Sequence, residues 1–135
     1  MRRRLSAVVG VGISLVVRGT MPVVAHHSFA TEFDANKPVQ LEGTVTKMEW
    51  TNPHSWIHID VIKPDGTLEN WAIEGGSPSS LVRRGLRKSD LPAGTKIKVI
   101  GFRARDGGLR ANGKDLTLAD GRSLFFSGAP DAPEK

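Results

Sequence analysis

Short apolar runs recur along this chain about every 10 to 12 residues and are separated by turns rich in Gly, Pro and Asp. Within the runs, apolar and polar residues alternate: Ile57 and Ile59 share one face, and His58 lies between them on the other. A period of two is typical of half-buried β-strands and argues against an amphipathic helix. The pattern therefore predicts an all-β domain, either a small barrel or a sandwich.

The order of the expected elements favours a barrel of the OB type. Ser77 is a favourable N-cap and Pro78 a favourable first helical residue, so one short helix is expected at 78–84. The apolar parity of the first strand switches near Thr46, which predicts a bulge or bend there. Three strands, a helix and further strands predict a small OB-like antiparallel barrel with one short helix, although a generic open barrel or sandwich gives nearly the same pattern. The strands are expected at 39–50, 55–63, 68–74, 96–105, 109–118 and 123–126.

The N-terminal segment has the pattern of a secretory signal peptide. Residues 2–4 are basic, 5–17 form an apolar run, and a small-residue cleavage site ends at Ala25. The apolar run is shorter than the roughly 20 residues that span a bilayer. We therefore expect a periplasmic or secreted protein, not membrane-spanning, that begins at His26; a later cut after Ala30 would remove this residue. The expected organisation is a signal peptide at 1–25, an OB-like barrel at 26–127 and a disordered tail at 128–135.

Composition narrows the classes of function. The chain of 135 residues has no cysteine, which excludes disulfides, thiolate metal sites and thiol catalysis. Removal of residues 1–25 takes away four arginines and no acid, so the net charge falls from +5 to +1. Nucleic acid requires a concentrated basic face, so no such partner is expected. The motifs of common enzyme classes are missing, which favours a non-enzymatic binding protein; a copper oxygenase is the third alternative.

Three segments carry a resemblance to a known family. They read Ala-His-His-Ser-Phe at 25–29, Trp-Thr-Asn-Pro-His-Ser-Trp at 50–56, and Gly-Ser-Pro at 76–78 with Arg-Arg-Gly at 83–85. In these segments the chain resembles a family of small exported bacterial proteins of unknown function, over essentially the whole mature chain. The resemblance implies a periplasmic or secreted single domain with a small β-barrel. It implies no activity.

All four histidines follow the expected cleavage site, as the pairs His26 with His27 and His54 with His58. The free amine and imidazole of an N-terminal His26 form a compact set of nitrogen donors that suits Cu(II) or Ni(II). One hypothesis is a copper site of the histidine-brace type, completed by a second imidazole, for which we favour His54. On one strand, His54 and His58 would lie about 13 Å apart, too far to bind one ion together. The alternative is that His26 and His27 lie on a frayed terminus and the other two histidines are surface residues.

A metal-free alternative assigns binding to an exposed tryptophan. Trp56 shares the parity of His58, away from the apolar face, so we expect it to be exposed and able to contact a glycan or a protein partner, another periplasmic protein for example. Asn52, in the turn before it, is either part of this binding surface or a structural turn residue. Trp71 is expected in the core. The two main hypotheses are thus an exported copper-binding protein and a barrel that binds through Trp56.

Overall fold

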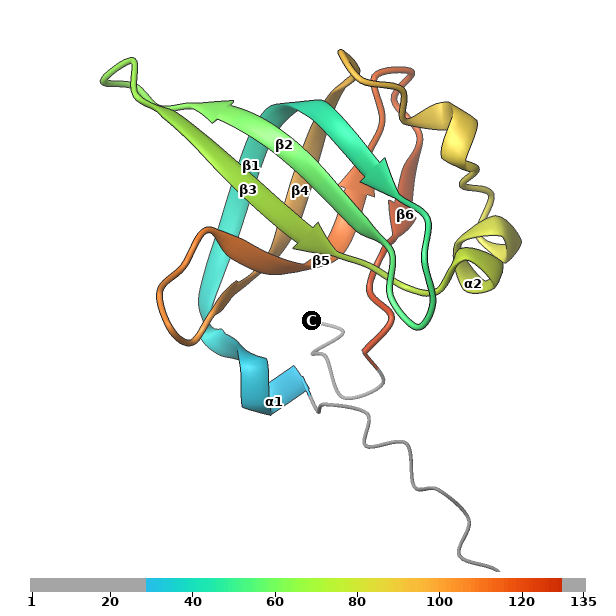
Figure 1. The fold of residues 1–135 in the computed structure, drawn as a ribbon, viewed down its shortest axis with the longest axis horizontal. Coiled ribbons are helices and arrows are strands. Elements are labelled where there is room, and N and C mark those ends of the chain that lie inside the picture. Colours follow the sequence, from blue (N-terminus) through green and yellow to red (C-terminus); the bar gives the residue numbers. More distant parts are fainter. Residues whose placement is uncertain (1–28, 130–135) are drawn as a thin grey trace, which may run out of the picture.

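Six strands surround the core of the computed structural model, which describes residues 29–129 (Figure 1). Antiparallel pairings run in the order β3-β2-β1-β4-β5-β6, and a parallel pairing of β3 with β5 closes the ring. A closed ring of five strands with a helix between β3 and β4 confirms the predicted OB-like barrel, except that its closing pair is parallel rather than antiparallel. The elements are α1 (Phe29–Glu32), β1 (Phe33–Glu49), β2 (Trp56–Ile62), β3 (Leu68–Glu74), α2 (Pro78–Arg83), the 3-10 turn η1 (Lys88–Asp90), β4 (Lys96–Ala104), β5 (Arg110–Thr117) and β6 (Ser123–Phe125).

The first strand is longer than predicted and bends where expected. β1 begins at Phe33, six residues before the predicted start, and its first part pairs with β4 through an irregular register between Phe33 and Pro38. Between Val45 and Lys47 the register with β2 shifts, which confirms the predicted irregularity. The bend lets one long strand pair with β4 along most of its length and with β2 at its end.

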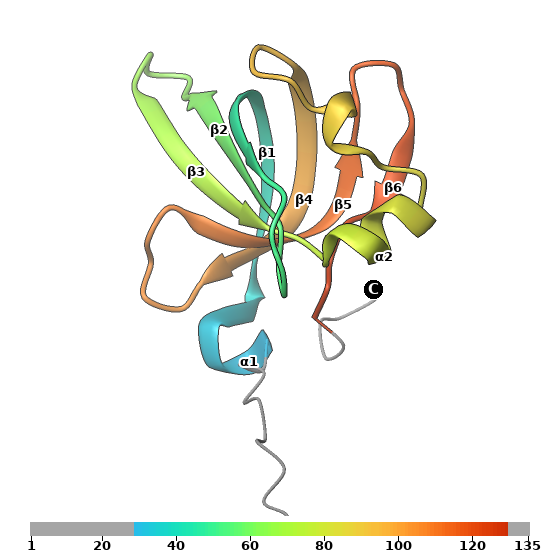
Figure 2. The same ribbon diagram turned by 45° about the vertical axis from the view of Figure 1, so that its right-hand side comes forward.

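The inward faces of the strands form one large apolar cluster. Ile57, Ile59 and Ile73 are fully buried, and Trp71 is 4% exposed, as predicted. Val61 packs against the cluster but is only partly buried. It lies toward the outer end of the β2–β3 hairpin, where β3 no longer pairs with β5 and the hairpin projects from the barrel (Figures 1 and 2).

A smaller aromatic cluster closes the end of the barrel below which α1 lies (Figure 2). Phe29 of α1 is 4% exposed and contacts the ring of Phe102 edge to face, with 5.5 Å between ring centroids. The Arg105 backbone N–H donates to the Glu32 carbonyl at 2.9 Å, and the Arg105 Nε–H donates to the Ala30 carbonyl at 2.6 Å. Only one helix was predicted, because four residues are too few to show a helical period.

The predicted helix is α2, and its ends follow the predicted chemistry. Ser77 Oγ accepts a hydrogen bond from the Ser80 N–H at 3.3 Å, and Gly85 stops the helix with a φ of 90°. Arg84 Nη1 then donates to the Ser127 carbonyl at 2.8 Å, which ties α2 to the segment after β6. Within residues 29–129 no helix is long and apolar enough to cross a membrane.

Candidate functional site: a histidine and a buried carboxylate at the end of β3

The loop between β1 and β2 brings His54 to the end of β3. The Ser55 N–H donates to the Gly76 carbonyl at 3.0 Å, and the Gly75 N–H donates to the Ser55 carbonyl at 2.8 Å, so the loop is fixed to the chain that leaves β3. In this position His54 Nδ1 lies 3.2 Å from the Gly75 carbonyl oxygen and 3.5 Å from Glu74 Oε1. A histidine and a carboxylate that are 20 residues apart in sequence thus become neighbours.

The contacts of His54 determine which ring nitrogen is available. A carbonyl oxygen only accepts hydrogen bonds, so Nδ1 carries the hydrogen in the bond to Gly75. Nε2 then carries the lone pair, and it makes no hydrogen bond to the described residues. The His54 side chain is 28% exposed. His54 therefore presents an unused nitrogen while its other nitrogen is held by the fold.

Glu74 is the unusual member of the pair because it is a carboxylate with only 7% exposure. Its register partner in the parallel β3–β5 pairing is the fully buried Asn112. Burial raises the pKa of Glu74, the nearby His54 opposes this shift, and the charge of Glu32 on α1 adds to it.

Further polar groups are buried around the pair. Ser127 Oγ donates to Asn112 Oδ1 at 3.0 Å, whereas Ser55 Oγ is buried and has no hydrogen-bond partner among the described residues. Gly75 is required here because a Cβ at this position would lie 2.3 Å from the Phe126 ring. At the end of β3, the backbone therefore packs tightly against the Phe126 ring. Beside it lies a buried polar group with unused hydrogen-bonding capacity.

His58 lies elsewhere, on β2, and has a different acidic partner. Its Nε2 is 3.4 Å from Glu49 Oε1 and is buried without a hydrogen bond to the described residues. Lys47 donates to the same carboxylate oxygen, and this hydrogen bond lowers the pKa of Glu49. The structure thus brings His54 to Glu74 and His58 to Glu49, and it does not bring the two histidines to one common partner.

The other predicted site residues lie in different environments. Trp56 is half-buried on the outer face, between its register partners Glu49 on β1 and Glu74 on β3, so it is less exposed than predicted. Asn52 is exposed in the loop that carries His54. His26 and His27 lie outside the described residues. Between residues 29 and 129, no three His, Cys, Asp or Glu side chains form a group that could hold a metal ion.

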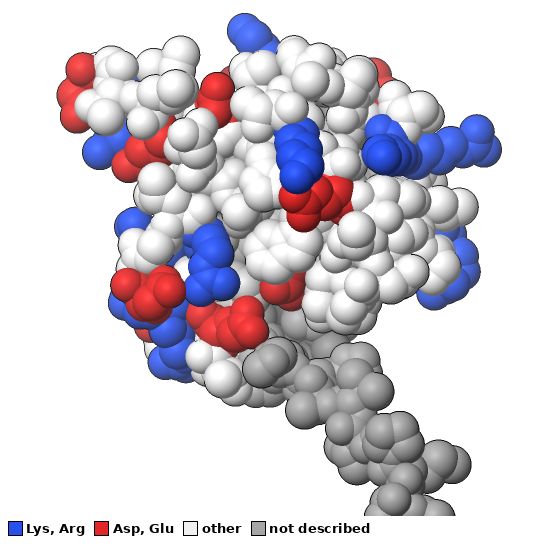
Figure 3. Space-filling model, viewed as in Figure 1, with Lys and Arg blue, Asp and Glu red and all other residues white. Residues whose placement is uncertain are grey.

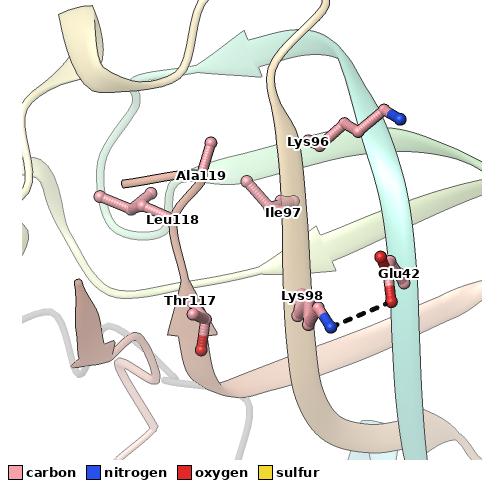
Figure 4. A pocket seen from close by; sticks show the side chains of 7 residues that line it. All are labelled: Glu42, Lys96, Ile97, Lys98, Thr117, Leu118 and Ala119. Atoms are coloured by element: carbon pink, nitrogen blue, oxygen red, sulfur yellow. Dashed lines mark ion pairs between the residues drawn. The ribbon is translucent and has the colours of Figure 1, made fainter. Parts of the chain in front are cut away.

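Two other surface features differ from this site in their chemistry. A depression of about 150 Å³ lies over β1, β4 and the end of β5, with Ile97 and Leu118 among its lining residues (Figure 4). Lys98 also lines it, but its Nζ is paired with Glu42 Oε2 at 3.3 Å. On the face seen in Figure 3, acidic and basic side chains are interspersed and no single sign of charge dominates. The depression therefore has neither a histidine nor a buried carboxylate among its lining residues.

Comparison with known proteins places the chain in a family. Residues 14–113 match the model of a family of unknown function, DUF6152. The chain belongs to this family. Membership in DUF6152 confirms the resemblance to a family of unknown function, and the match extends from before α1 into β5, so it includes His54 and Glu74. No curated protein and no solved structure matches the chain.

Sequence reasoning singled out His54 but missed Glu74 and Asn112. A usable signal existed for Glu74, because an acid stands directly between an apolar strand and two glycines. No such signal pointed to Asn112, because it lies in a segment where apolar and polar residues alternate only weakly. What brings these residues together in this DUF6152 protein is the closing β3–β5 pairing.

Proposed function

We propose that the mature protein is an exported, non-enzymatic Cu(II)-binding module, periplasmic or secreted, in which His26 and His54 hold the ion. The observation that carries this proposal is the orientation of His54. Histidines that bind metals usually donate their second ring N–H to a carbonyl or carboxylate, which fixes the tautomer and the ring orientation. His54 has both kinds of partner at Nδ1, the Gly75 carbonyl and the Glu74 carboxylate, and keeps Nε2 for an ion.

The anchoring of α1 supports the participation of His26. Phe29 is buried at 4% exposure three residues after His26, and three residues of extended chain span at most about 11 Å. Glu32, in the same short helix, already acts on the pKa of Glu74. Cleavage after Ala25 would thus leave a free amine tethered at the end of the barrel that carries His54.

The donor set fits the ion. An amine and two imidazoles are nitrogen ligands of the type that Cu(II) prefers, and His27 offers another beside the first. His58 is not part of the proposed set, because its Nε2 is buried against Glu49. Residues 29–129 supply only part of a metal site, so the proposal requires the N-terminal histidine.

The test is a Cu(II) titration of the processed protein at pH 7, after the intact mass of the exported protein has been used to check for a start at His26. One variant carries an extra Gly before His26, a second is His54→Ala, and His58→Ala is the matched control. We expect the extension and His54→Ala each to weaken binding at least about 10-fold, and His58→Ala to leave it unchanged. The affinity should also fall steeply from about pH 8 to 5, because the amine and imidazoles must be deprotonated to bind.

Two results would refute the proposal. An unchanged affinity and copper spectrum in the extended protein would exclude the amine as a ligand. If the extension weakens binding but His54→Ala does not, the ion is chelated by the terminus alone. Binding of a protein or glycan by the surface around Trp56 would then be the better hypothesis.

A further inference from the structure

The outer half of β3 forms an open edge of the sheet. β5 pairs with β3 only from Ala72 onward, so residues 68–71, the β3 edge, have β2 on one side and no described strand on the other. The Ala72 N–H donates to the Leu109 carbonyl at 3.0 Å, away from β2. Because backbone groups alternate in direction along a strand, those of Leu68 and Asn70 point the same way as those of Ala72. The β3 edge therefore offers unpaired donors and acceptors to another strand.

The two most exposed large apolar side chains of the described residues lie beside this edge. Ile62 is 74% exposed and Leu68 is 54% exposed. They are register partners on β2 and β3, so they lie next to each other on one face, where the hairpin projects from the barrel (Figure 1). An apolar pair beside an open edge is the combination that favours pairing with another chain.

The acidic side chains near the β3 edge are already engaged within the chain. Glu69 Oε1 lies 3.6 Å from Lys63 Nζ, and Glu69 Oε2 accepts a hydrogen bond from Trp71 Nε1 at 2.9 Å. Asp60 accepts a hydrogen bond from the side-chain amide of Asn70. The surface therefore offers little to a strongly charged partner and matches an edge that is itself largely neutral and apolar. The same segment of a second copy is such an edge.

We propose that the protein forms a two-fold symmetric dimer in which the β3 edges of two copies pair antiparallel. Three registers turn the outward backbone groups of Leu68 and Asn70 toward the second copy. A register centred on Asn70 is blocked, because it needs Ala72, which already pairs with Arg110 of β5. A register centred on Glu69 puts two glutamates directly opposite each other, which is destabilising. The remaining register is centred on Leu68.

Pairing about Leu68 completes an apolar row across the two-fold axis. Each Leu68 exchanges both backbone hydrogen bonds with Leu68 of the second copy, at a Cα separation of about 5.5 Å. Ile62 extends the row on both sides, since it is the neighbour of Leu68 on β2 in each copy. Few residues take part, so we expect a weak dimer that forms at high protein concentration. The interface lies at the end of β2 opposite to the His54 loop, so the inference is independent of the proposed copper binding.

Single cysteines test the register, because the chain itself has no cysteine. Leu68→Cys should form a disulfide-linked dimer under mild oxidation with diamide, since a Cα separation of about 5.5 Å suits a disulfide. Asn70→Cys, on the same edge, is one control, because the two cysteines would lie about 14 Å apart along the strands. Val82→Cys, at a site on α2 that is 51% exposed, is the other. Both controls should cross-link at least about 10-fold more slowly on non-reducing gels.

Sedimentation equilibrium of the cysteine-free protein measures association without a cross-link. With EDTA present to exclude metal bridging, the average mass should rise toward that of two chains between about 5 and 500 µM. Leu68→Ser should weaken association at least about 10-fold, because it removes two apolar side chains from each dimer. Val82→Ser should leave association unchanged.

Three outcomes would overturn the proposal. A protein that stays monomeric throughout this range does not form the dimer, and its β3 edge then serves a different partner or none. Faster cross-linking of Asn70→Cys than of Leu68→Cys would show that the register is wrong. Equal cross-linking of Val82→Cys would show that random collisions form the disulfide. Ile62→Ser, which should also weaken association, keeps the test valid should Leu68→Ser fold poorly.

Discussion

Removing the ring of Phe29 is expected to release α1 from the end of the barrel. The side chain is 4% exposed and its ring centroid lies 5.8 Å from that of Phe33 and 5.5 Å from that of Phe102. A buried phenylalanine removes about 150–250 Å² from water, which at about 25 cal/mol per Å² corresponds to roughly 4–6 kcal/mol. Because that figure is an upper bound, we expect Phe29→Ala to lower the free energy of unfolding by about 3–5 kcal/mol.

Urea unfolding of the processed protein, followed by tryptophan fluorescence, measures this loss. Phe29→Leu is the matched control, since it retains most of the apolar area and should cost less than about 1.5 kcal/mol. In thermal unfolding, each kcal/mol corresponds to about 4–8 °C for a domain of this size. A loss below about 1 kcal/mol in Phe29→Ala would show that α1 is not docked in solution. Phe29 would then not tether His26 near His54.

Three further predictions concern stability. Ile59→Ala should cost about 2–5 kcal/mol in urea unfolding, because Ile59 is fully buried, whereas Ile62→Ala, at a site 74% exposed, should change the free energy by less than about 0.5 kcal/mol. Arg84→Ala should cost about 1–2 kcal/mol by the same measurement, through loss of the 2.8 Å bond to the Ser127 carbonyl; an unchanged midpoint would mean that the bond is not formed in solution. Burial raises the pKa of Glu74 above its value in the unfolded chain, so ionisation of Glu74 lowers stability as the pH rises from the unfolded to the folded pKa. Thermal unfolding should therefore show Glu74→Gln at least as stable as the parent at pH 7. This difference should disappear below about pH 4, where Glu74 is protonated in both states. A less stable Gln variant at pH 7 would show that attraction to His54 outweighs burial.

The elements that could be predicted from the sequence are those with strong local signals. β3 has the predicted bounds, and α2 begins after Ser77, as its cap and the following proline indicate. The start of β1 was missed because residues 34–38 are mostly polar and join the sheet by pairing with β4, which a period of two does not reveal. Local chemistry decides helix ends and turns, whereas the extent of a strand depends on its neighbour.

The parallel closure and the buried carboxylate required tertiary information. Ala72 pairs with Arg110, almost 40 residues away, and no local pattern predicts which distant strand will close the ring. The parity of β3 places Glu74 on the outer face, opposite Ile73, where an acid is normally solvated. It is buried because the loop that carries His54 packs against that end of the strand. The alternation of residues predicts on which face of the sheet a side chain lies. Whether that side chain is buried depends on the neighbouring segments.

The candidate site forms where the barrel closes, so a substitution elsewhere in the core should lower the stability of the fold without changing the affinity of the site. The pair of His54 and Glu74 depends on two connections: the backbone bonds from Ser55 to Gly75 and Gly76, and the β3–β5 pairing. Neither connection involves the side chain of Ile59. If copper binds as proposed, a folded Ile59→Ala molecule should therefore bind it as tightly as the parent, even though fewer molecules are folded. Loss of the Phe29 ring removes the tether itself, so the folded molecules of that variant should bind copper less tightly. Equal loss of affinity in both variants would mean that the site follows global stability and is not organised by α1.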